Sequence, residues 1–225
     1  DLEMIKREYE AAINRGELVR EEFRGNIVGL LSTKGDNIQH IRGADSTTSE
    51  SHTAANIHAR SSLLKHLKFL RRLRGCENIV LEDMRTEIGI RETYRIDGLY
   101  QITHEDYTSG KVFDDSLSYS YYPIDLHIIE HGVTPKQLSD GVVATVPLRA
   151  LIPKNSKNFM VAGRCLSSDR LANSALRVQG SSMAMGQAAA ATAVIACQRN
   201  VSPADVPLDE VRELLRNHGA IVPTV

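Results

Sequence analysis

The 225-residue sequence predicts a mixed class, α+β overall and α/β in its C-terminal part. Apolar residues recur at helical spacing near the N-terminus, and short β-like apolar runs follow them. The run from Phe159 to Ala162 is continuously apolar and ends at Gly163, which is typical of a buried parallel strand. A polar loop and a helix of small residues come after that run, as in an α/β unit.

The N-terminal region predicts two helices. Residues 2–15 are expected to form the first, because Gly16 follows as a stop and apolar residues recur at helical spacing: Leu2, Ile5, Tyr9 and Ile13. Between residues 23 and 41, short apolar runs broken by glycines predict strands. Thr47 with Glu50 predicts a capping box. A long helix is then expected to end near Gly75 and to bury one stripe of leucines, namely Leu63, Leu67, Leu70 and Leu73.

The middle of the chain is less regular. Residues 79–81 and 88–90 predict short strands, and residues 93–147 are aromatic and irregular. A last short helix is expected over residues 209–218 and stops at Gly219. Its apolar side consists of Leu208, Val211, Leu214 and Leu215.

The stretch GSSMAMGQAAAATAVIAC, residues 180–197, predicts a helix with a nearly smooth surface. The first N–H groups of a helix lack partners, and the helix dipole places about half a positive charge there. Gly180 at the entry lets a ligand approach the backbone closely. We therefore expect an anion-binding pocket at this helix N-terminus, at the carboxyl end of a parallel strand, where open α/β sheets bind ligands.

Composition excludes several kinds of partner. The net charge of −1 gives no reason to expect nucleic acid, and the basic stretch at residues 65–74 is typical of the solvated face of an amphipathic helix. The longest apolar run, residues 183–197, falls short of the roughly 20 residues that a membrane helix needs. A cytoplasmic location is expected, because no signal peptide opens the sequence and the three cysteines have no CxxC spacing.

Three segments resemble the family of FAD-dependent oxidoreductases. FMVAGRCLSSDRLANSALRVQGSSMAMGQAAAA (159–190) is similar to the family's closing segment. IGIRETYRIDGLYQITHEDYTSGKVFDDSLSYSYYPIDLH (88–127) is similar to its central segment, and PLRALIPK (147–154) to its link back to the flavin domain. The resemblance implies a β-rich substrate or cap domain over residues 1–150. Residues 151–225 would then supply the C-terminal strand and helix of a FAD-binding domain of the glutathione-reductase type.

The resemblance also implies FAD as the cofactor. The helix N-terminus would point at the pyrimidine edge of the flavin and stabilise the negative charge of the reduced ring. The residues implied in cofactor binding are Gly163, Arg164, Ser174, Arg177, Val178, Ser181, Ser182 and Met183. Arg164 could instead form a surface ion pair with Asp169.

One family feature is absent. The family opens with a GxGxxG turn that holds the adenosine pyrophosphate, and no GxGxxG occurs in the 225 residues. The chain is therefore expected to be a C-terminal half. Its partner would be the N-terminal FAD-binding half, in the same gene product or in another chain.

The expected reaction is hydride transfer from a small polar substrate to FAD. His127, in the stretch YYPIDLH, is the candidate base, since histidine exchanges protons near neutral pH. Tyr122 lies in the same stretch and is a second catalytic candidate. Arg91 is expected to orient substrate or flavin, because arginine binds planar carboxylates and carbonyls. Two of these have a structural alternative: His127 could be held by Asp125, and Arg91 could pair with a nearby acid.

Two other functions stay open. The chain could be a non-catalytic subunit or remnant that completes a partner flavoprotein. The letters H-x-x-E-H at His127, Glu130 and His131 also match a zinc-hydrolase pattern, which requires a helix to bring both histidines to one face. The neighbouring Pro123 and Gly132 make a helix there an unfavourable prediction. We expect no metal site.

Overall fold

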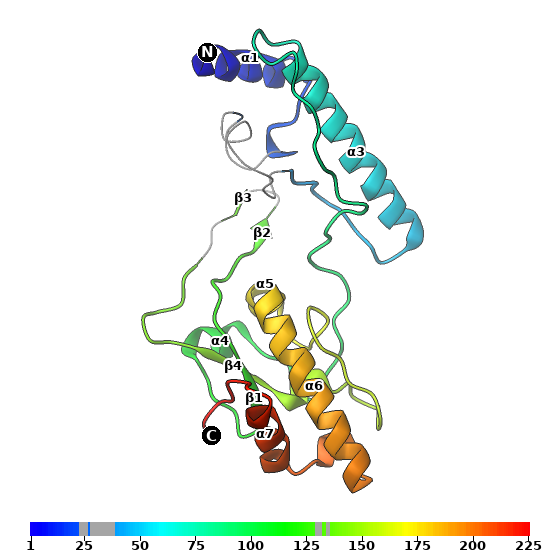
Figure 1. The fold of residues 1–225 in the computed structure, drawn as a ribbon, viewed down its shortest axis with the longest axis vertical. Coiled ribbons are helices and arrows are strands. Elements are labelled where there is room, and N and C mark those ends of the chain that lie inside the picture. Colours follow the sequence, from blue (N-terminus) through cyan, green and yellow to red (C-terminus); the bar gives the residue numbers. More distant parts are fainter. Residues whose placement is uncertain (23–26, 28–38, 129–131, 134–135) are drawn as a thin grey trace. The chain divides into compact units, whose positions relative to one another are not determined.

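The computed structural model describes residues 1–22, 27, 39–128, 132–133 and 136–225 (Figure 1). The chain folds as two compact units, residues 1–90 and residues 91–225. The predicted domain boundary between residues 150 and 151 stays a prediction.

The first unit is helical. Helix α1 (Leu2–Asn14) is capped by Asp1, whose carboxylate accepts hydrogen bonds from the N–H groups of Glu3 and Met4. A short 3-10 helix, η1 (Arg20–Glu22), precedes the long helix α3 (Ser49–Arg71). The rings of Tyr9 and Phe69 meet edge to face with centroids 6.1 Å apart, so α1 packs on the C-terminal part of α3. The predicted helix over residues 2–15 is confirmed.

The predicted start and buried face of the long helix need correction. Thr48 and Ser51 form the capping box, one residue later than predicted, because their side chains and backbone N–H groups bond reciprocally. Leu70 and Leu73 are buried as predicted, but Leu63 and Leu67 are only partly buried. The buried face lies beside the leucine stripe and includes small and polar residues: Ala55, Ala59, Ser62, His66, Phe69 and Leu70.

The strands predicted at residues 79–81 and 88–90 are wrong. Neither segment forms a strand, and Val80 and Leu81 are exposed. A short apolar run becomes a strand only where a partner strand can bond to it, and α3 supplies none. The strands predicted between residues 23 and 41 lie almost wholly outside the described residues.

The second unit is built on an antiparallel ribbon. Strand β1 (Ser116–Ser120) pairs with β4 (Ala144–Pro147), with Ser120 opposite Ala144 and Ser118 opposite Val146. A second pair joins β2 (His127–Ile128) to β3 (Gly132–Val133). Helix α4 (His104–Ser109) lies beside β4, and the 3-10 helix η2 (Leu148–Leu151) continues from that strand.

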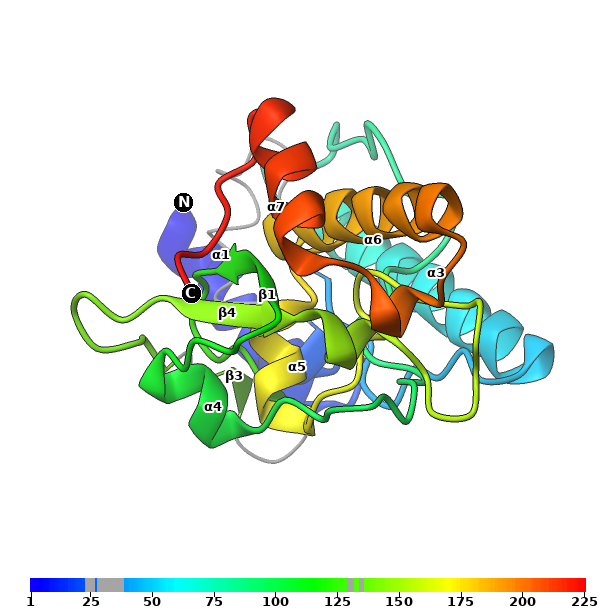
Figure 2. The same cartoon turned by 90° about the horizontal axis from the view of Figure 1, so that it is seen from below.

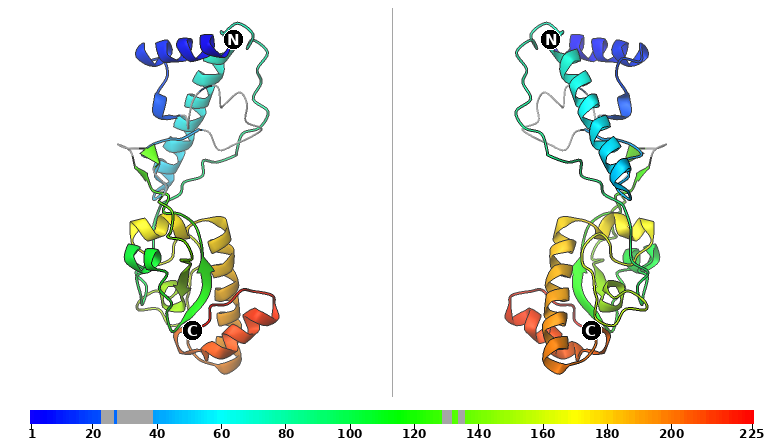
Figure 3. Two further views of the ribbon diagram at one scale, coloured as in Figure 1. Left: turned by 90° about the vertical axis from the view of Figure 1, so that its left-hand side faces the viewer. Right: turned by 90° about the vertical axis from the view of Figure 1, so that its right-hand side faces the viewer.

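The C-terminal helices cover this ribbon. Helix α5 (Arg170–Leu176) leads into α6 (Gln179–Arg199), which lies alongside β1 (Figure 3). A 3-10 turn, η3 (Pro203–Asp205), then leads to α7 (Leu208–Asn217), which packs on α6 (Figure 2). Ala188, Ala191 and Ala196 of α6 join Leu117, Val211 and Leu215 in one core cluster. Both predicted C-terminal helices are confirmed, and the small α6 side chains permit this close packing.

The predicted parallel strand at residues 159–162 is wrong. Phe159 is 57% exposed, and the segment is bonded to its surroundings by the Val161 N–H group, which donates to the Leu151 carbonyl at 2.8 Å. The paired strands among the described residues are antiparallel. A buried parallel strand needs neighbours on both edges. The described structure is therefore α+β rather than α/β.

Candidate functional site

An open pocket lies at the N-terminus of α6. Its volume is about 380 Å³. One wall is residues 119–122, where β1 ends, and the other is residues 178–181, where α6 begins. Among the described residues, those that line the pocket carry no charge. The pocket brings together three residues predicted from the sequence, Tyr122, Val178 and Ser181.

The helix that borders the pocket begins without a side-chain cap. Val178 is the N-cap residue of the 21-residue helix α6, and its side chain cannot accept a hydrogen bond. The first-turn N–H groups therefore keep their capacity to bind an acceptor, and the helix dipole favours a negative one. Gly180 lies in this turn, and a Cβ atom there would meet nothing within 4 Å. The backbone at the pocket is consequently open to a ligand.

A hydrogen-bonded serine pair joins the two walls. The Oγ atoms of Ser120 and Ser181 lie 2.7 Å apart, and both residues are buried. Tyr107 of α4 supports the same corner: its hydroxyl donates to the Tyr122 carbonyl at 2.8 Å and accepts from the Tyr122 N–H group at 3.1 Å. Burial raises the pKa of the Tyr107 hydroxyl, so it stays protonated and remains a donor.

A polar cluster adjoins the pocket. The Arg177 guanidinium donates from Nη2 to the Asp125 carbonyl at 2.9 Å and from Nε to the Ser174 carbonyl at 3.3 Å. The backbone N–H group of Asp125 donates to Ser174 Oγ at 3.1 Å. Arg91 Nη1 lies 3.6 Å from Asp125 Oδ2. Arg91, Ser174 and Arg177, all predicted site residues, thus gather around Asp125.

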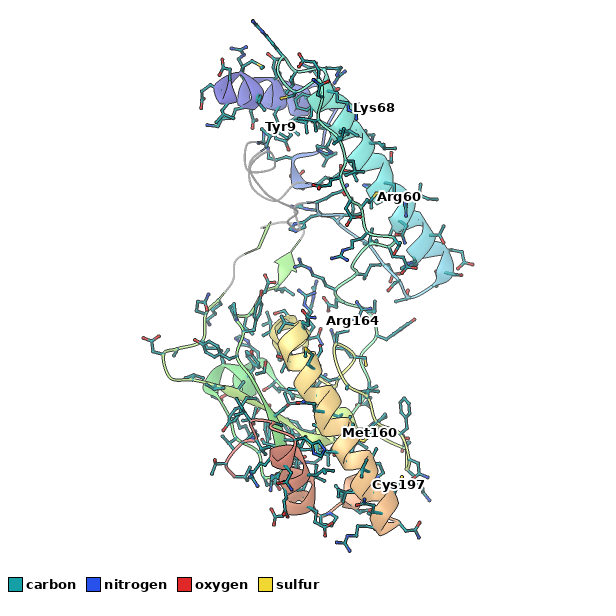
Figure 4. The ribbon with its side chains drawn as sticks, viewed as in Figure 1. Tyr9, Arg60, Lys68, Met160, Arg164 and Cys197 are labelled. Atoms are coloured by element: carbon teal, nitrogen blue, oxygen red, sulfur yellow. The ribbon has the colours of Figure 1, made fainter. Side chains whose placement is uncertain are left out.

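The remaining cofactor candidates lie in different surroundings. Gly163 has a positive φ of 86°, and a Cβ atom there would lie 3.6 Å from Ser182 Oγ, so these two predicted residues are neighbours. Arg164 lies near α5 (Figure 4), where Asn173 Nδ2 donates to its carbonyl at 3.0 Å. Met183 is 66% exposed.

His127 lies in strand β2, where its backbone pairs with Val133. The zinc pattern needs a helix, whose turn brings the two histidines close enough to bind one ion, and His127 lies in a strand instead. Glu130 and His131 lie outside the described residues. Within the described part of the chain, no group of three or more His, Cys, Asp or Glu residues is placed to hold a metal ion.

Several residues at the site were not predicted from the sequence. Tyr107 and Ser120 organise the corner, and Tyr119, Tyr121 and Gln179 line the pocket. The stretch SLSYS offered one signal, because alternation in a strand places Ser118 and Ser120 on the same face. Nothing local to Tyr107 indicates that its hydroxyl reaches Tyr122, since that interaction depends on how α4 packs.

Comparison with known proteins identifies the family. A family model described as FAD dependent oxidoreductase matches residues 2–215. Curated proteins and solved structures give no significant match. Among the described residues, no helix is long and apolar enough to cross a membrane. Members of this family bind FAD. Because the match extends over nearly the whole sequence, the chain belongs to the FAD-dependent oxidoreductases.

Proposed function

We propose that this chain is the C-terminal part of an enzyme that oxidises a small polar substrate by hydride transfer to FAD. Residues 151–225 would form the C-terminal part of a FAD-binding domain of the glutathione-reductase type. The proposal unites the family match with the pocket at the α6 N-terminus.

The observation that carries the proposal is the uncapped start of α6 in an open pocket. Unpaired N–H groups and the positive end of a helix dipole suit the polar, electron-rich edge of a flavin ring. The tyrosine wall at residues 119–122 offers flat apolar surface for the ring. The residues present therefore fit the flavin end of FAD. When bound, FAD supplies a hydride acceptor in its ring system.

The chain's own residues would have separate tasks. Residues 178–183 would hold the flavin edge, and Gly163, Arg164 and Ser174 would complete the cofactor side. His127 would remove a proton from the substrate as the hydride leaves. Arg91 and Tyr122 would orient the substrate. His127→Ala should then abolish turnover while FAD stays bound. Loss of FAD from this variant would contradict the assignment of His127 as base.

We further propose that a GxGxxG-bearing half supplies the adenosine pyrophosphate site, in the same gene product or in a partner chain. The chain itself contains no such turn, and this turn is what places a pyrophosphate on a helix N-terminus.

A visible absorption spectrum of the purified chain tests the proposal. The spectrum is recorded before and after addition of excess FAD and removal of what stays unbound. A retained flavin band supports a pocket that binds FAD by itself. A band that is retained only with the GxGxxG-bearing half supports a divided site. The absence of a band under both conditions overturns the proposal.

A further inference from the structure

Helix α3 has an outer face that combines cations with large aliphatic side chains. Ile57, Leu64 and Lys68 lie on one side of the helix, because they follow one another at steps of seven and four residues. Lys65 neighbours Lys68 at a spacing of three residues. Ile57 is 64% exposed and Leu64 is 51% exposed. Both lysines are exposed as well, and Figure 4 labels Lys68 on the helix. We call these four residues the outer face of α3.

The charge of this part of the helix is positive. Residues 52–75 contain six Arg or Lys residues and no Asp or Glu. Arg60 and Arg71 donate to main-chain carbonyls, at 2.8 and 2.7 Å, which satisfies their N–H groups without neutralising their charge. Among the described residues, Lys65 and Lys68 form no ion pair. The outer face therefore carries cations that are open to an anionic partner.

The acids that accompany the helix do not cover this face. Glu17 pairs with Arg72, just past the end of the helix, and Glu87 lies 3.6 Å from His52 near its start. The other acids of residues 77–87 form no ion pair with the lysines of the outer face, within the part of the chain that the structure describes. The lysines thus keep their charge exposed to solvent.

The helix dipole accounts for only part of this pattern. Lys68 and Arg71 lie in the last turn, where cations interact favourably with the negative end of the dipole. The dipole gives no reason for Ile57 and Leu64, because an exposed aliphatic side chain gains nothing from it. Both side chains would gain free energy in a contact that removes them from water.

Cations beside exposed aliphatic side chains fit the surface of an anionic lipid bilayer. Lys and Arg attract anionic headgroups, whereas aliphatic side chains enter the boundary between headgroups and acyl chains. The long apolar stem of a lysine lets its ammonium stay at headgroup level while the helix lies on the surface. A nucleic acid would engage the lysines through its phosphates but would give Ile57 and Leu64 no apolar environment. The combination therefore favours a membrane surface.

We propose that the outer face of α3 binds the chain peripherally to anionic membranes, with Ile57 and Leu64 in the bilayer surface and Lys65 and Lys68 on lipid phosphates. This assigns a partner to the basic stretch at residues 65–74, which composition alone favours as a solvated face. A peripheral contact of this kind needs no membrane-spanning helix. The proposal goes beyond the proposed function and does not depend on FAD.

Co-sedimentation of the full chain with lipid vesicles tests the proposal. One set of vesicles is phosphatidylcholine alone, and the other contains phosphatidylcholine and phosphatidylglycerol in equal parts. We expect binding to the anionic vesicles and not to the neutral ones, and weaker binding as the salt concentration rises. Lys65→Gln combined with Lys68→Gln should weaken binding about 30-fold, or about 2 kcal/mol, from the contribution of each cation near an anionic surface.

Two further double variants separate the contributions. Ile57→Ser combined with Leu64→Ser keeps the charge and should weaken binding about tenfold, because the aliphatic contact is lost. Lys136→Gln combined with Lys157→Gln is the matched control. It removes the same charge from two exposed lysines of the second unit and should bind as wild type does. Circular dichroism confirms that each variant is folded.

Three results would overturn the proposal. The first is a wild-type chain that does not sediment with anionic vesicles. The second is equal weakening by the two lysine pairs, which would show attraction by net charge and not by the outer face. The third is wild-type affinity in the Ile57 and Leu64 double variant, which would make the face a site for a nucleic acid or another polyanion. Each of these results leaves the FAD-binding proposal untouched, because FAD retention is measured separately.

Discussion

Ser120 Oγ and Ser181 Oγ lie 2.7 Å apart, and this buried hydrogen bond ties the end of strand β1 to the first turn of helix α6. These two segments are also the two walls of the pocket. The bond therefore links the stability of the second unit to the shape of its candidate site.

Removing one serine of this pair should destabilise the protein. Ser120→Ala or Ser181→Ala leaves a buried hydroxyl without that partner, which costs about 1–3 kcal/mol. The double variant should lose less than the sum of the two single variants, because it removes both polar groups together. Urea unfolding measures these differences. Ser182→Ala is the control, because its hydroxyl makes a long bond of 3.5 Å to the Arg177 carbonyl, and we expect a change within about 0.5 kcal/mol.

Tyr107→Phe should loosen the tyrosine wall. The change leaves both the N–H group and the carbonyl of Tyr122 without the hydroxyl that bonds them, at a cost of about 1–3 kcal/mol. We expect a lower free energy of unfolding and weaker binding of any pocket ligand, measured by calorimetry. Tyr94→Phe alters a side chain that is 71% exposed and lies outside the pocket lining, and should leave both quantities unchanged. An equal effect of the two substitutions would contradict this role for Tyr107.

Gly180→Asp should separate cofactor binding from folding. A carboxylate in the first turn of α6 interacts favourably with the helix dipole, and a Cβ atom fits there, so stability should stay constant or rise by about 0.5 kcal/mol. The same carboxylate should repel the electron-rich flavin edge and weaken FAD binding by about tenfold, or about 1.4 kcal/mol. Gly180→Asn is the neutral control of the same shape. FAD titrations of the two variants, followed by absorption, give the comparison; equal affinities would place the flavin elsewhere.

Asp106 should make the second unit sensitive to acid. Burial acts to raise the pKa of this carboxyl, but hydrogen bonds from Lys111, Thr103 and Tyr100 outweigh it and lower the pKa to about 2. Because the folded pKa lies below the unfolded value, the stabilisation is present above about pH 4 and is lost as the pH falls towards 2. Its size is on the order of 2 kcal/mol.

Urea unfolding of wild type and Asp106→Asn between pH 5 and pH 2.5 checks this. The difference in unfolding free energy between the two proteins should shrink as the pH falls. Asp140→Asn, which alters an exposed acid, should follow wild type throughout. A constant gap between wild type and Asp106→Asn would show that Asp106 stabilises by packing and not by its charge.

Helices with clear start and stop signals were predictable from the sequence. Helix α1 lies between Asp1 and Gly16, and α7 ends before Gly219, because caps and glycines act locally. The short apolar runs at residues 79–81, 88–90 and 159–162 misled the prediction. A strand exists only through hydrogen bonds to another segment, and such bonds cannot be read from the run itself.

The α6 pocket and the buried face of α3 also show which features could be predicted from the sequence and which could not. An anion-binding pocket was expected at the N-terminus of α6, at the carboxyl end of a parallel strand. A pocket lies at that N-terminus, but its other wall is the end of the antiparallel strand β1, and its binding of an anion stays a prediction. The predicted buried face of α3 was wrong because the prediction equated leucine with burial, whereas Ser62 and His66 are enclosed. Ser62 donates to Glu22 of η1 and Phe69 packs on Tyr9 of α1, so burial follows from which segments lie on each face, and hydrophobicity alone does not decide that.

The sequence by itself determined the family, the principal helices and the small side chains at the start of α6, because motif order, caps and side-chain size are local properties. Only the tertiary structure decided that Tyr107 reaches Tyr122, that Ser120 reaches Ser181 and that Arg91 and Arg177 meet at Asp125. The physical reason is range: a side chain bonds whatever group the packing brings within about 3 Å, and that group lies 15, 61 or 52 residues away along the chain for the three hydrogen bonds involved.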